Sequence, residues 1–226
     1  NVRVKEIKIN PCTGKLVAAT FGRGMWETDL LPTDHVYQEI DTSEMWSNDR
    51  ILENSFIVKS PNTLTVTGTL YMPKNSRIIV EPGATLVVDG GRITQNCGHL
   101  WKGIEVWGER DLPQIPITNQ GKLQIINEGT IENAEIAILA GKRLADTTGF
   151  DPRYAGGLVW CTDGNLINNQ ISALFTPYTY YSRSYFRNTD FLTNRTLNDS
   201  TLPVSFIKAY GVADVSVYGC SFRNTQ

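Results

Sequence analysis

Few residues in this sequence combine the type and the spacing that metal or redox chemistry requires. Its two histidines, His35 and His99, have no His, Asp or Glu at metal-ligand spacing on a shared face. The four cysteines include no Cys-x-x-Cys pair, which argues against a zinc knot and against a scaffold built from disulfides. These cysteines are Cys12, Cys97, Cys161 and Cys220. We therefore expect no metal site and no cofactor.

Two sets of acidic residues could support acid–base chemistry. Calcium-assisted elimination needs several carboxylates around the cation and a base that takes the proton, and Asp151, Arg153 and Asp163 form the nearest set. Asp151 and Arg153 lie in a proline-containing insertion and Asp163 lies in an expected turn, which favours solvated turns over a catalytic centre. Hydrolysis of a glycoside needs two facing carboxyl groups. Only Glu128 and Asp163 align one repeat apart, and both lie in an expected turn, so no residue is assigned a catalytic role.

A cluster of tyrosines is the clearest candidate for binding a ligand. Because alternate residues of a strand point outward, part of this cluster should face solvent and could stack on sugar rings. Ordinary packing is the alternative interpretation. The candidate residues for carbohydrate contact are Tyr178, Tyr180, Tyr181 and Tyr185.

Composition excludes two classes of partner. The 226 residues carry a formal net charge of -2, with 21 basic and 23 acidic side chains and no basic block, so nucleic acid is not an expected partner. No apolar run approaches the roughly 20 residues that span a bilayer, so membrane insertion is not expected. The first residues lack the apolar core of a signal peptide, so we expect any export signal to lie outside this sequence.

The composition and the hydrophobic pattern of the chain change twice along its length. Residues 1–30 contain two alternating stretches, 4–9 and 15–20, around a turn, which predicts antiparallel strands. Residues 31–54 are acidic and irregular, and we interpret them as a linker or cap. Residues 55–226 contain short β-rich runs separated by Gly, Asn and Asp, and almost no stretch keeps a helical period. This last part is predicted to be all-β.

Self-comparison reveals a repeat that ends in asparagine. Four five-residue segments share the order small, polar, apolar, polar or apolar, Asn, and they span residues 129–133, 164–168, 184–188 and 220–224. Their asparagines are 35, 20 and 36 positions apart (168−133, 188−168 and 224−188). The spacing of 20 suits one coil of a parallel solenoid made of three short strands, and the longer spacings suit coils that carry inserted loops.

The recurring asparagine has a physical explanation. Asn tolerates the left-handed backbone conformation at a corner, and its amide can hydrogen-bond to the Asn one coil away. We therefore expect a structural ladder in equivalent corners of successive coils, while a general preference of Asn for turns is the alternative. The ladder residues are Asn133, Asn168, Asn188 and Asn224.

The repeat extends upstream without a gap. Residues 123–128 align with residues 158–163, which places Cys161 on an apolar strand position and Asp163 opposite Glu128. Cys220 falls three positions further on in the repeat than Cys161, so the two sulfur atoms should not stack. We therefore expect no disulfide between these two cysteines.

A second pattern is carried by three segments, Val66-Thr67-Gly68-Thr69, Glu81-Pro82-Gly83-Ala84-Thr85-Leu86 and Trp101-Lys102-Gly103-Ile104-Glu105-Val106-Trp107-Gly108. They resemble the pectin-lyase-like, right-handed parallel β-helix regions of large Bacteroidota surface proteins exported by the type IX secretion system. Near the start, Phe21-Gly22-Arg23-Gly24-Met25-Trp26 resembles the element that closes blades of sialidase-like and sortilin-like β-propellers. These resemblances imply a propeller-blade remnant at residues 1–30 and a parallel β-helix at residues 55–226, with further coils after residue 226.

The β-helix fold also houses polysaccharide-degrading enzymes. Polygalacturonases carry four short motifs on neighbouring coils, and Asn188-Thr189-Asp190 matches the first of them. The other three, Asp-Asp, Gly-His-Gly and Arg-Ile-Lys, do not occur in the 226 residues. Because Phe222-Arg223-Asn224-Thr225 repeats Phe186-Arg187-Asn188-Thr189, the match is better explained by the repeat itself.

The sequence therefore predicts a structural or adhesive segment of a large secreted cell-surface protein rather than an enzyme. Its expected partners are neighbouring domains of the same chain, with surface glycans or other copies of itself as further candidates. Two alternatives stay open. One is a polysaccharide-active, pectinase-like enzyme whose catalytic coils lie outside this segment, and the other is a non-catalytic carbohydrate-binding module.

Overall fold

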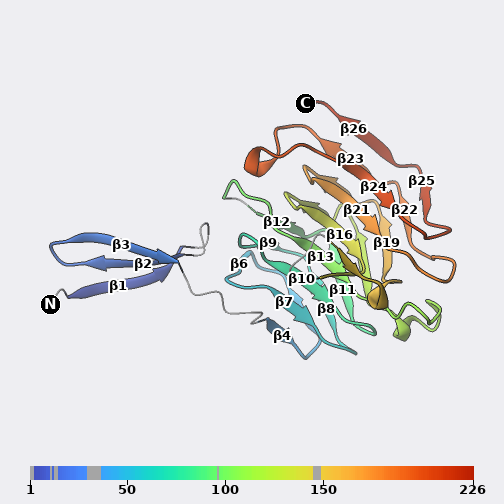
Figure 1. Cartoon of the computed structure of the whole chain (residues 1–226), viewed down its shortest axis with the longest axis horizontal. Helices are drawn as coiled ribbons and strands as arrows, with labels where there is room; N and C mark the ends of the chain where they lie inside the picture. The colour runs from blue at the N-terminus through green and yellow to red at the C-terminus, as the bar shows by residue number, and fades with distance from the viewer. Residues whose placement is uncertain (1–2, 11, 13–14, 30–36, 96, 145–148) are drawn as a thin grey trace.

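The computed structural model of this protein describes residues 3–10, 12, 15–29, 37–95, 97–144 and 149–226 (Figure 1). This part of the chain is all-β, as its sequence predicts. It contains three seven-stranded parallel sheets, a separate three-stranded antiparallel sheet and a two-stranded pair.

The separate sheet contains β1 (Val4–Ile9), β2 (Lys15–Thr20) and β3 (Gly24–Asp29) in that order, and its strands are antiparallel. Gly22 and Gly24 turn the chain between β2 and β3 with φ angles of 81° and 80°, which residues with a Cβ rarely adopt. Every residue of β1 is exposed, and in Figure 1 the sheet stands apart from the parallel sheets. A sheet without a covered apolar face is at best marginally stable alone, so this unit needs a tie or a partner.

Apart from the pair β17 and β18, every third strand of the remaining described chain enters the same parallel sheet. The first sheet contains β4 (Gln38–Ile40), β7 (Phe56–Val58), β10 (Arg77–Val80), β13 (Gly103–Val106), β16 (Ile136–Ala140), β21 (Ile171–Phe175) and β24 (Ser205–Ala209). The second contains β5 (Glu44–Trp46), β8 (Thr63–Val66), β11 (Thr85–Asp89), β14 (Lys122–Ile126), β19 (Leu158–Thr162), β22 (Tyr185–Arg187) and β25 (Ser216–Tyr218). The third contains β6 (Arg50–Ile51), β9 (Thr69–Tyr71), β12 (Arg92–Thr94), β15 (Thr130–Glu132), β20 (Asn165–Ile167), β23 (Asp190–Thr193) and β26 (Ser221–Asn224).

We call one passage of the chain through the three sheets a winding. The described residues contain seven windings, from β4–β6 to β24–β26, and we call them together the stack. Figure 1 shows the windings lying side by side in chain order, as a colour gradient from blue to red. Each strand is therefore hydrogen-bonded to the strands of the windings before and after it.

The core of the stack is formed by the inward side of each strand. In β11, Leu86 and Val88 are fully buried, whereas the other three residues of the strand remain partly exposed. Parallel pairing then places each inward residue directly on its equivalent in the next winding. In the third sheet this column is Leu70, Ile93, Ile131, Leu166, Phe191 and Phe222. Because burying one such side chain contributes about 1.5–3 kcal/mol, the column directly stabilises the stacking of windings.

The first winding lies inside the range that the sequence suggests is a linker or cap, residues 31–54. Here β4, β5 and β6 pair in parallel with β7, β8 and β9, and residues 31–36 lie outside the described residues. These strands have two or three residues each, too few for an alternating pattern to be recognisable. Ile40 and Trp46 are buried, and the Arg50 guanidinium lies 4.4 Å from the Trp46 ring, so a cation–π contact closes this end of the core.

Inserted loops lengthen several windings. Glu44 and Leu64 pair across 20 residues (64−44), and Thr63 and Thr85 across 22 (85−63), whereas Thr85 pairs with Lys122 across 37 (122−85). The loops contain the short elements η1 (Ile117–Asn119), β17 (Lys142–Arg143), β18 (Phe150–Asp151), η2 (Pro152–Tyr154) and η3 (Asn198–Ser200).

One of these loops covers the outer face of the first sheet. Phe150 packs on an apolar cluster formed by Ile136, Leu139, Ile171 and Leu174. On the same sheet the Glu105 side chain is only 3% exposed, and its two oxygens accept hydrogen bonds from Arg77 Nη1 at 2.8 Å and Trp107 Nε1 at 2.9 Å. The charge is thus paired and hydrogen-bonded, as a buried carboxylate requires.

Candidate functional site

The corner that follows the third sheet brings together Asn133 and Asn168. Both have positive φ, at 60° and 52°, and the pairing of β15 with β20 places them in equivalent positions of consecutive windings. In the next two windings the same corner position is occupied by Thr193 and then by Asn224. Ile167 pairs with Leu192, which places Thr193 opposite Asn168, and Thr193 in turn pairs with Asn224.

The side chains of Asn133 and Asn168 bond to residues at or just after the ends of neighbouring strands rather than to each other. Asn133 Nδ2 donates to Thr94 Oγ1 at 3.0 Å and to the carbonyl of Gln95 at 3.2 Å. Asn168 Nδ2 donates to Asn194 Oδ1 at 3.1 Å, and the Asn194 backbone N–H donates back to Asn168 Oδ1 at 3.0 Å. These bonds fix the chain where it leaves the third sheet.

Asn188 lies in a different corner, between the second and third sheets, because β22 belongs to the second sheet. The single ladder of four asparagines that the repeat predicts is therefore split between two corners. At this second corner, five successive windings carry a residue with positive φ. They are Gly90, Asn127, Asp163, Asn188 and Gly219, with φ of 65°, 54°, 53°, 49° and 64°. Some strands of each sheet are followed by an asparagine in the left-handed conformation, so the local pattern before the asparagine cannot distinguish the corners.

Side-chain bonds join neighbouring windings at this second corner. Asn127 Nδ2 donates to Asp89 Oδ1 at 2.7 Å, and Asn188 Nδ2 donates to Asp163 Oδ1 at 3.1 Å. The inter-winding amide bond that the sequence suggests for a corner asparagine thus occurs here, with aspartate as the acceptor. A signal was present in the sequence, since Asn, Asp or Gly follows the second-sheet strand in each of these windings.

The pairing of β14 with β19 also corrects the alignment upstream. Ile125, not Ile126, pairs with Cys161, so Asp163 lies opposite Asn127. Glu128 is an additional residue in the corner, with φ of 64° and its N–H donating to the Asp163 carbonyl at 2.7 Å. A one-residue insertion is invisible when two segments are aligned without a gap.

The four tyrosines do not form one exposed platform. Tyr178 is 7% exposed and its hydroxyl donates to the Leu112 carbonyl at 2.7 Å, and burial raises the pKa of this tyrosine to about 12. Tyr185, in β22, stacks on Trp160 with ring centroids 6.1 Å apart. Only Tyr180 and Tyr181 are exposed, at 41% and 74%.

Two hollows flank Tyr180 and Tyr181. One also contains Gln114, Arg183 and Asp214, and the other is continued by residues 211–213. Tyr180 is held by a hydrogen bond from its hydroxyl to the Asp111 carbonyl at 3.1 Å, so the inserted loop before β14 fixes this ring. The pair could therefore present a flat face beside polar groups, which is a geometry suited to a sugar ring.

The acidic residues considered for catalysis are engaged separately. Asp151 accepts hydrogen bonds from Arg153 Nη2 at 2.7 Å and Nε at 3.0 Å, and these bonds hold the pKa of its carboxyl below the usual value. Asp190 lies 3.4 Å from Arg223, and Asp163 binds Asn188 in the corner. Within the described part of the chain, no group of three or more His, Cys, Asp and Glu side chains could hold a metal ion.

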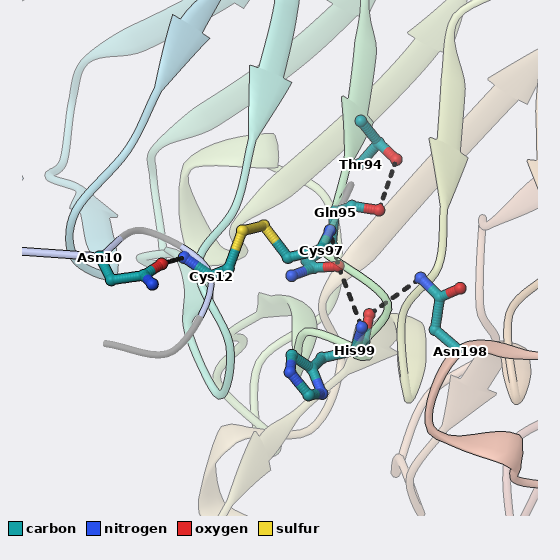
Figure 2. Close-up of a disulfide and its surroundings, with 7 residues drawn as sticks. All are labelled: Asn10, Cys12, Thr94, Gln95, Cys97, His99 and Asn198. Carbon is teal, nitrogen blue, oxygen red and sulfur yellow. Dashed lines mark hydrogen bonds between the residues drawn. A yellow bond between two sulfur atoms is a disulfide. The ribbon is translucent and has the colours of Figure 1, made fainter. Parts of the chain in front are cut away.

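A disulfide that the sequence analysis did not anticipate joins Cys12 to Cys97, which are 85 residues apart (Figure 2). It links the turn after β1 to the loop after β12. In that loop the backbone N–H groups of Cys97 and His99 both donate to Gln95 Oε1, at 2.8 and 3.2 Å. Cys161 and Cys220 are both free thiols, which confirms that they do not bond to each other.

Comparisons with protein-family models, with curated proteins and with solved structures find no match to this chain. Among the described residues, no helix is long and apolar enough to cross a bilayer. The function must therefore be argued from the stack, the two exposed tyrosines and the disulfide.

Proposed function

We propose that this chain is a structural or adhesive segment of a large secreted cell-surface protein, and that its seven windings form a right-handed parallel β-helix that acts as a stiff spacer. The observation that carries the proposal is the uninterrupted parallel register of three sheets over all seven windings. Such a stack has no natural hinge, because each winding shares backbone hydrogen bonds and core contacts with both neighbours. At about 4.8 Å between neighbouring strands, seven windings extend about 30 Å along the axis.

Placement outside the cell is supported by the Cys12–Cys97 bond. Disulfides persist in oxidising compartments and are rare in reducing ones. The bond also ties a weakly buried sheet to the stack, as an exported protein needs if its parts must stay together without chaperones.

For β1–β3 we propose membership of a propeller-like domain, of which this sheet is one blade. Trp26 is 59% exposed and Phe21 is 73% exposed, and both are large apolar side chains. Blades of a propeller bury such side chains against the next blade, so an additional sheet packed on β3 would remove this surface from water.

Labelling of intact cells tests the location. Antibodies against the stack should stain unpermeabilised cells of the source organism, and external protease should remove the signal. Staining that requires permeabilisation would contradict a surface role, whatever the stack binds.

Carbohydrate contact is a second candidate function, favoured by the hollows beside Tyr180 and Tyr181. We expect Tyr181→Ala to weaken binding to a glycan array, because stacking on the exposed ring is lost. Tyr218→Ala is the matched control, since Tyr218 is also 74% exposed but lies on β25 away from both sets of lining residues. Equal binding by both variants, or no binding by the unmodified protein, would argue against this function.

The structural proposal also predicts that this segment has no catalytic activity of its own. The protein should release no reducing ends or unsaturated uronates from pectin, alginate or xylan, with or without calcium. Cleavage that disappears in Asp163→Asn or Asp190→Asn would overturn the structural interpretation.

A further inference from the structure

A polar pocket lies on the outer face of the third sheet, over β9, β12 and β15. The side chains that matter for its chemistry are Tyr71, Arg92, Gln95, Glu132, Asn133 and Arg195. None of them belongs to the tyrosine hollows or to the corner between the second and third sheets. The pocket is therefore separate from those two sites, and it shares Asn133 with the corner that follows the third sheet.

The floor of the pocket is a buried carboxylate. The Glu132 side chain is 7% exposed, and its Oε1 accepts hydrogen bonds from Arg92 Nη2 at 2.6 Å, Thr94 Oγ1 at 2.7 Å and Asn133 Nδ2 at 3.1 Å. All of these donors converge on one oxygen. Oε2 of the same carboxylate is left to accept a hydrogen bond from a ligand.

Gln95 contributes a donor that the protein does not use. This residue is 2% exposed, and its Oε1 accepts from the N–H groups of Cys97 and His99, which fixes the orientation of the amide (Figure 2). Its Nε2 is buried and has no hydrogen-bond partner among the described residues. Buried donors without partners are rare because desolvation is costly, so this N–H₂ group calls for an acceptor.

Two arginines give the pocket an excess of positive charge over Glu132. Arg92 is half-exposed and uses Nη2 for Glu132. Arg195 is exposed, and its Nη2 donates to Asn133 Oδ1 at 2.9 Å, which orients the guanidinium at the rim. Each guanidinium has further N–H groups, and the planar fork matches the geometry of a carboxylate.

We propose that this pocket binds an organic anion that carries a carboxylate with hydroxyl groups close to it, such as a sugar acid or an open-chain hydroxy acid. The carboxylate is held by Arg92 and Arg195. A ligand hydroxyl donates to Glu132 Oε2, and a ligand oxygen accepts from Gln95 Nε2. Tyr71 at the side of the pocket covers the C–H face of the ligand. The inference does not depend on the spacer function.

The free oxygen of Glu132 decides between classes of anion. A phosphate or sulfate dianion places two negative charges beside that oxygen and is repelled by it, and it has no C–H face for Tyr71 to cover. A hydroxylated carboxylate supplies the missing donor and places its own charge at the arginines. A neutral sugar satisfies the hydrogen bonds but leaves the positive charge unmatched.

Calorimetric titration with D-glucuronate and D-gluconate tests the proposal, with acetate, D-glucose and inorganic phosphate as comparison probes. We expect saturable binding of at least one hydroxylated carboxylate, about tenfold or more tighter than acetate or glucose, since each lacks one of the two charge-assisted sets of bonds. Binding of glucuronate alone identifies a sugar acid, and binding of gluconate alone identifies an open-chain hydroxy acid. No saturation by either compound, or equal binding of acetate or phosphate, overturns the proposal.

Variants locate the binding. Arg195→Gln should weaken it about tenfold or more, because one charge-assisted pair is lost. Arg223→Gln is the matched control: it removes an equal charge from β26, where Arg223 is 56% exposed and outside the pocket. Glu132→Gln should weaken glucuronate or gluconate without weakening acetate, and circular dichroism checks that it folds. An equal loss in Arg195→Gln and Arg223→Gln would show general charge attraction and would refute the pocket.

Discussion

Five windings turn the corner between the second and third sheets through a residue with positive φ. The left-handed conformation costs an ordinary residue about 1–2 kcal/mol, whereas Gly adopts it freely and Asn or Asp tolerates it. The backbone conformation at this corner therefore determines which residue types can occupy it. The side-chain bonds from Asn127 to Asp89 and from Asn188 to Asp163 add a second contribution, because they join consecutive windings.

Substitution of Asn188 tests this requirement. Asn188→Ala should destabilise the protein by about 2–3 kcal/mol, from left-handed strain of about 1–2 kcal/mol and a lost hydrogen bond of about 1 kcal/mol. Asn188→Gly should cost less, since only the bond is lost. Urea unfolding measures both. Asn224→Ala is the control, because Asn224 is exposed and is not among the residues with positive φ; a cost for it equal to that of Asn188→Ala would contradict the backbone explanation.

The two free thiols should differ in reactivity. Burial raises the pKa of the Cys161 thiol to about 12, so at pH 8 only roughly one molecule in ten thousand carries the thiolate. Cys220 is partly exposed. Iodoacetamide at pH 8 should therefore alkylate Cys220 in the folded protein and Cys161 only after unfolding, as peptide mass spectrometry can show. Labelling of folded Cys220→Ser at Cys161 would contradict the burial.

At the scale of elements, the disulfide is the described link between two unequal units. The stack has a continuous core, whereas β1 has none of its residues buried. Cys12 and Cys97 lie in loops, so their bond holds the β1–β3 sheet without distorting the strands of the stack. The sheet depends on this bond more than the stack does.

Reduction should separate the two units in hydrogen exchange. With dithiothreitol, amides of β1–β3 should lose protection, while those of β7–β23 keep theirs, because the core of the stack does not include the disulfide. Cys97→Ser should give the same result without reductant, and reductant should then have no further effect. Unchanged protection of β1–β3 would show that other contacts hold the sheet.

At the scale of the whole molecule, the two ends of the stack differ. The first winding is closed by Trp46 and Arg50, and Ile40 there is buried. In the last winding, Phe222 is 47% exposed although it stacks on Phe191 at 4.7 Å between ring centroids. The inward residues of the described stack are therefore less well covered at the β24–β26 end.

The position of a core residue along the stack should determine how much free energy of unfolding is lost when its side chain is truncated to alanine. Phe191→Ala should destabilise by about 3–5 kcal/mol, as expected for a fully buried aromatic residue. Phe222→Ala removes an inward residue of the same column but should cost about 1–2 kcal/mol, because about half of its surface is already in water. Urea unfolding of the two variants makes the comparison. Equal costs would mean that the end of the stack is covered in solution.

Sequence by itself determined that the fold is all-β and which residues can turn a corner. Alternation such as Leu86 and Val88 in β11 gives the inward side of a strand, because that pattern is local and has a period of two. The asparagines and glycines mark corners for an equally local reason, their tolerance of positive φ. The alternation and the corner residues can both be recognised without knowing which strands are neighbours.

Tertiary structure decided what depends on register and on distant partners. Asn188 lies in a different corner from Asn133 and Asn168 because β22 pairs within the second sheet. Asp163 lies opposite Asn127 because one extra residue, Glu128, shifts the register without changing the local pattern. Cys12 forms a disulfide with Cys97 across 85 residues. The Tyr178 hydroxyl bonds to Leu112, which lies 66 positions earlier in the inserted loop before β14. The free energy of strand pairing is summed over whole windings, so a short segment cannot show which strand register is the most stable.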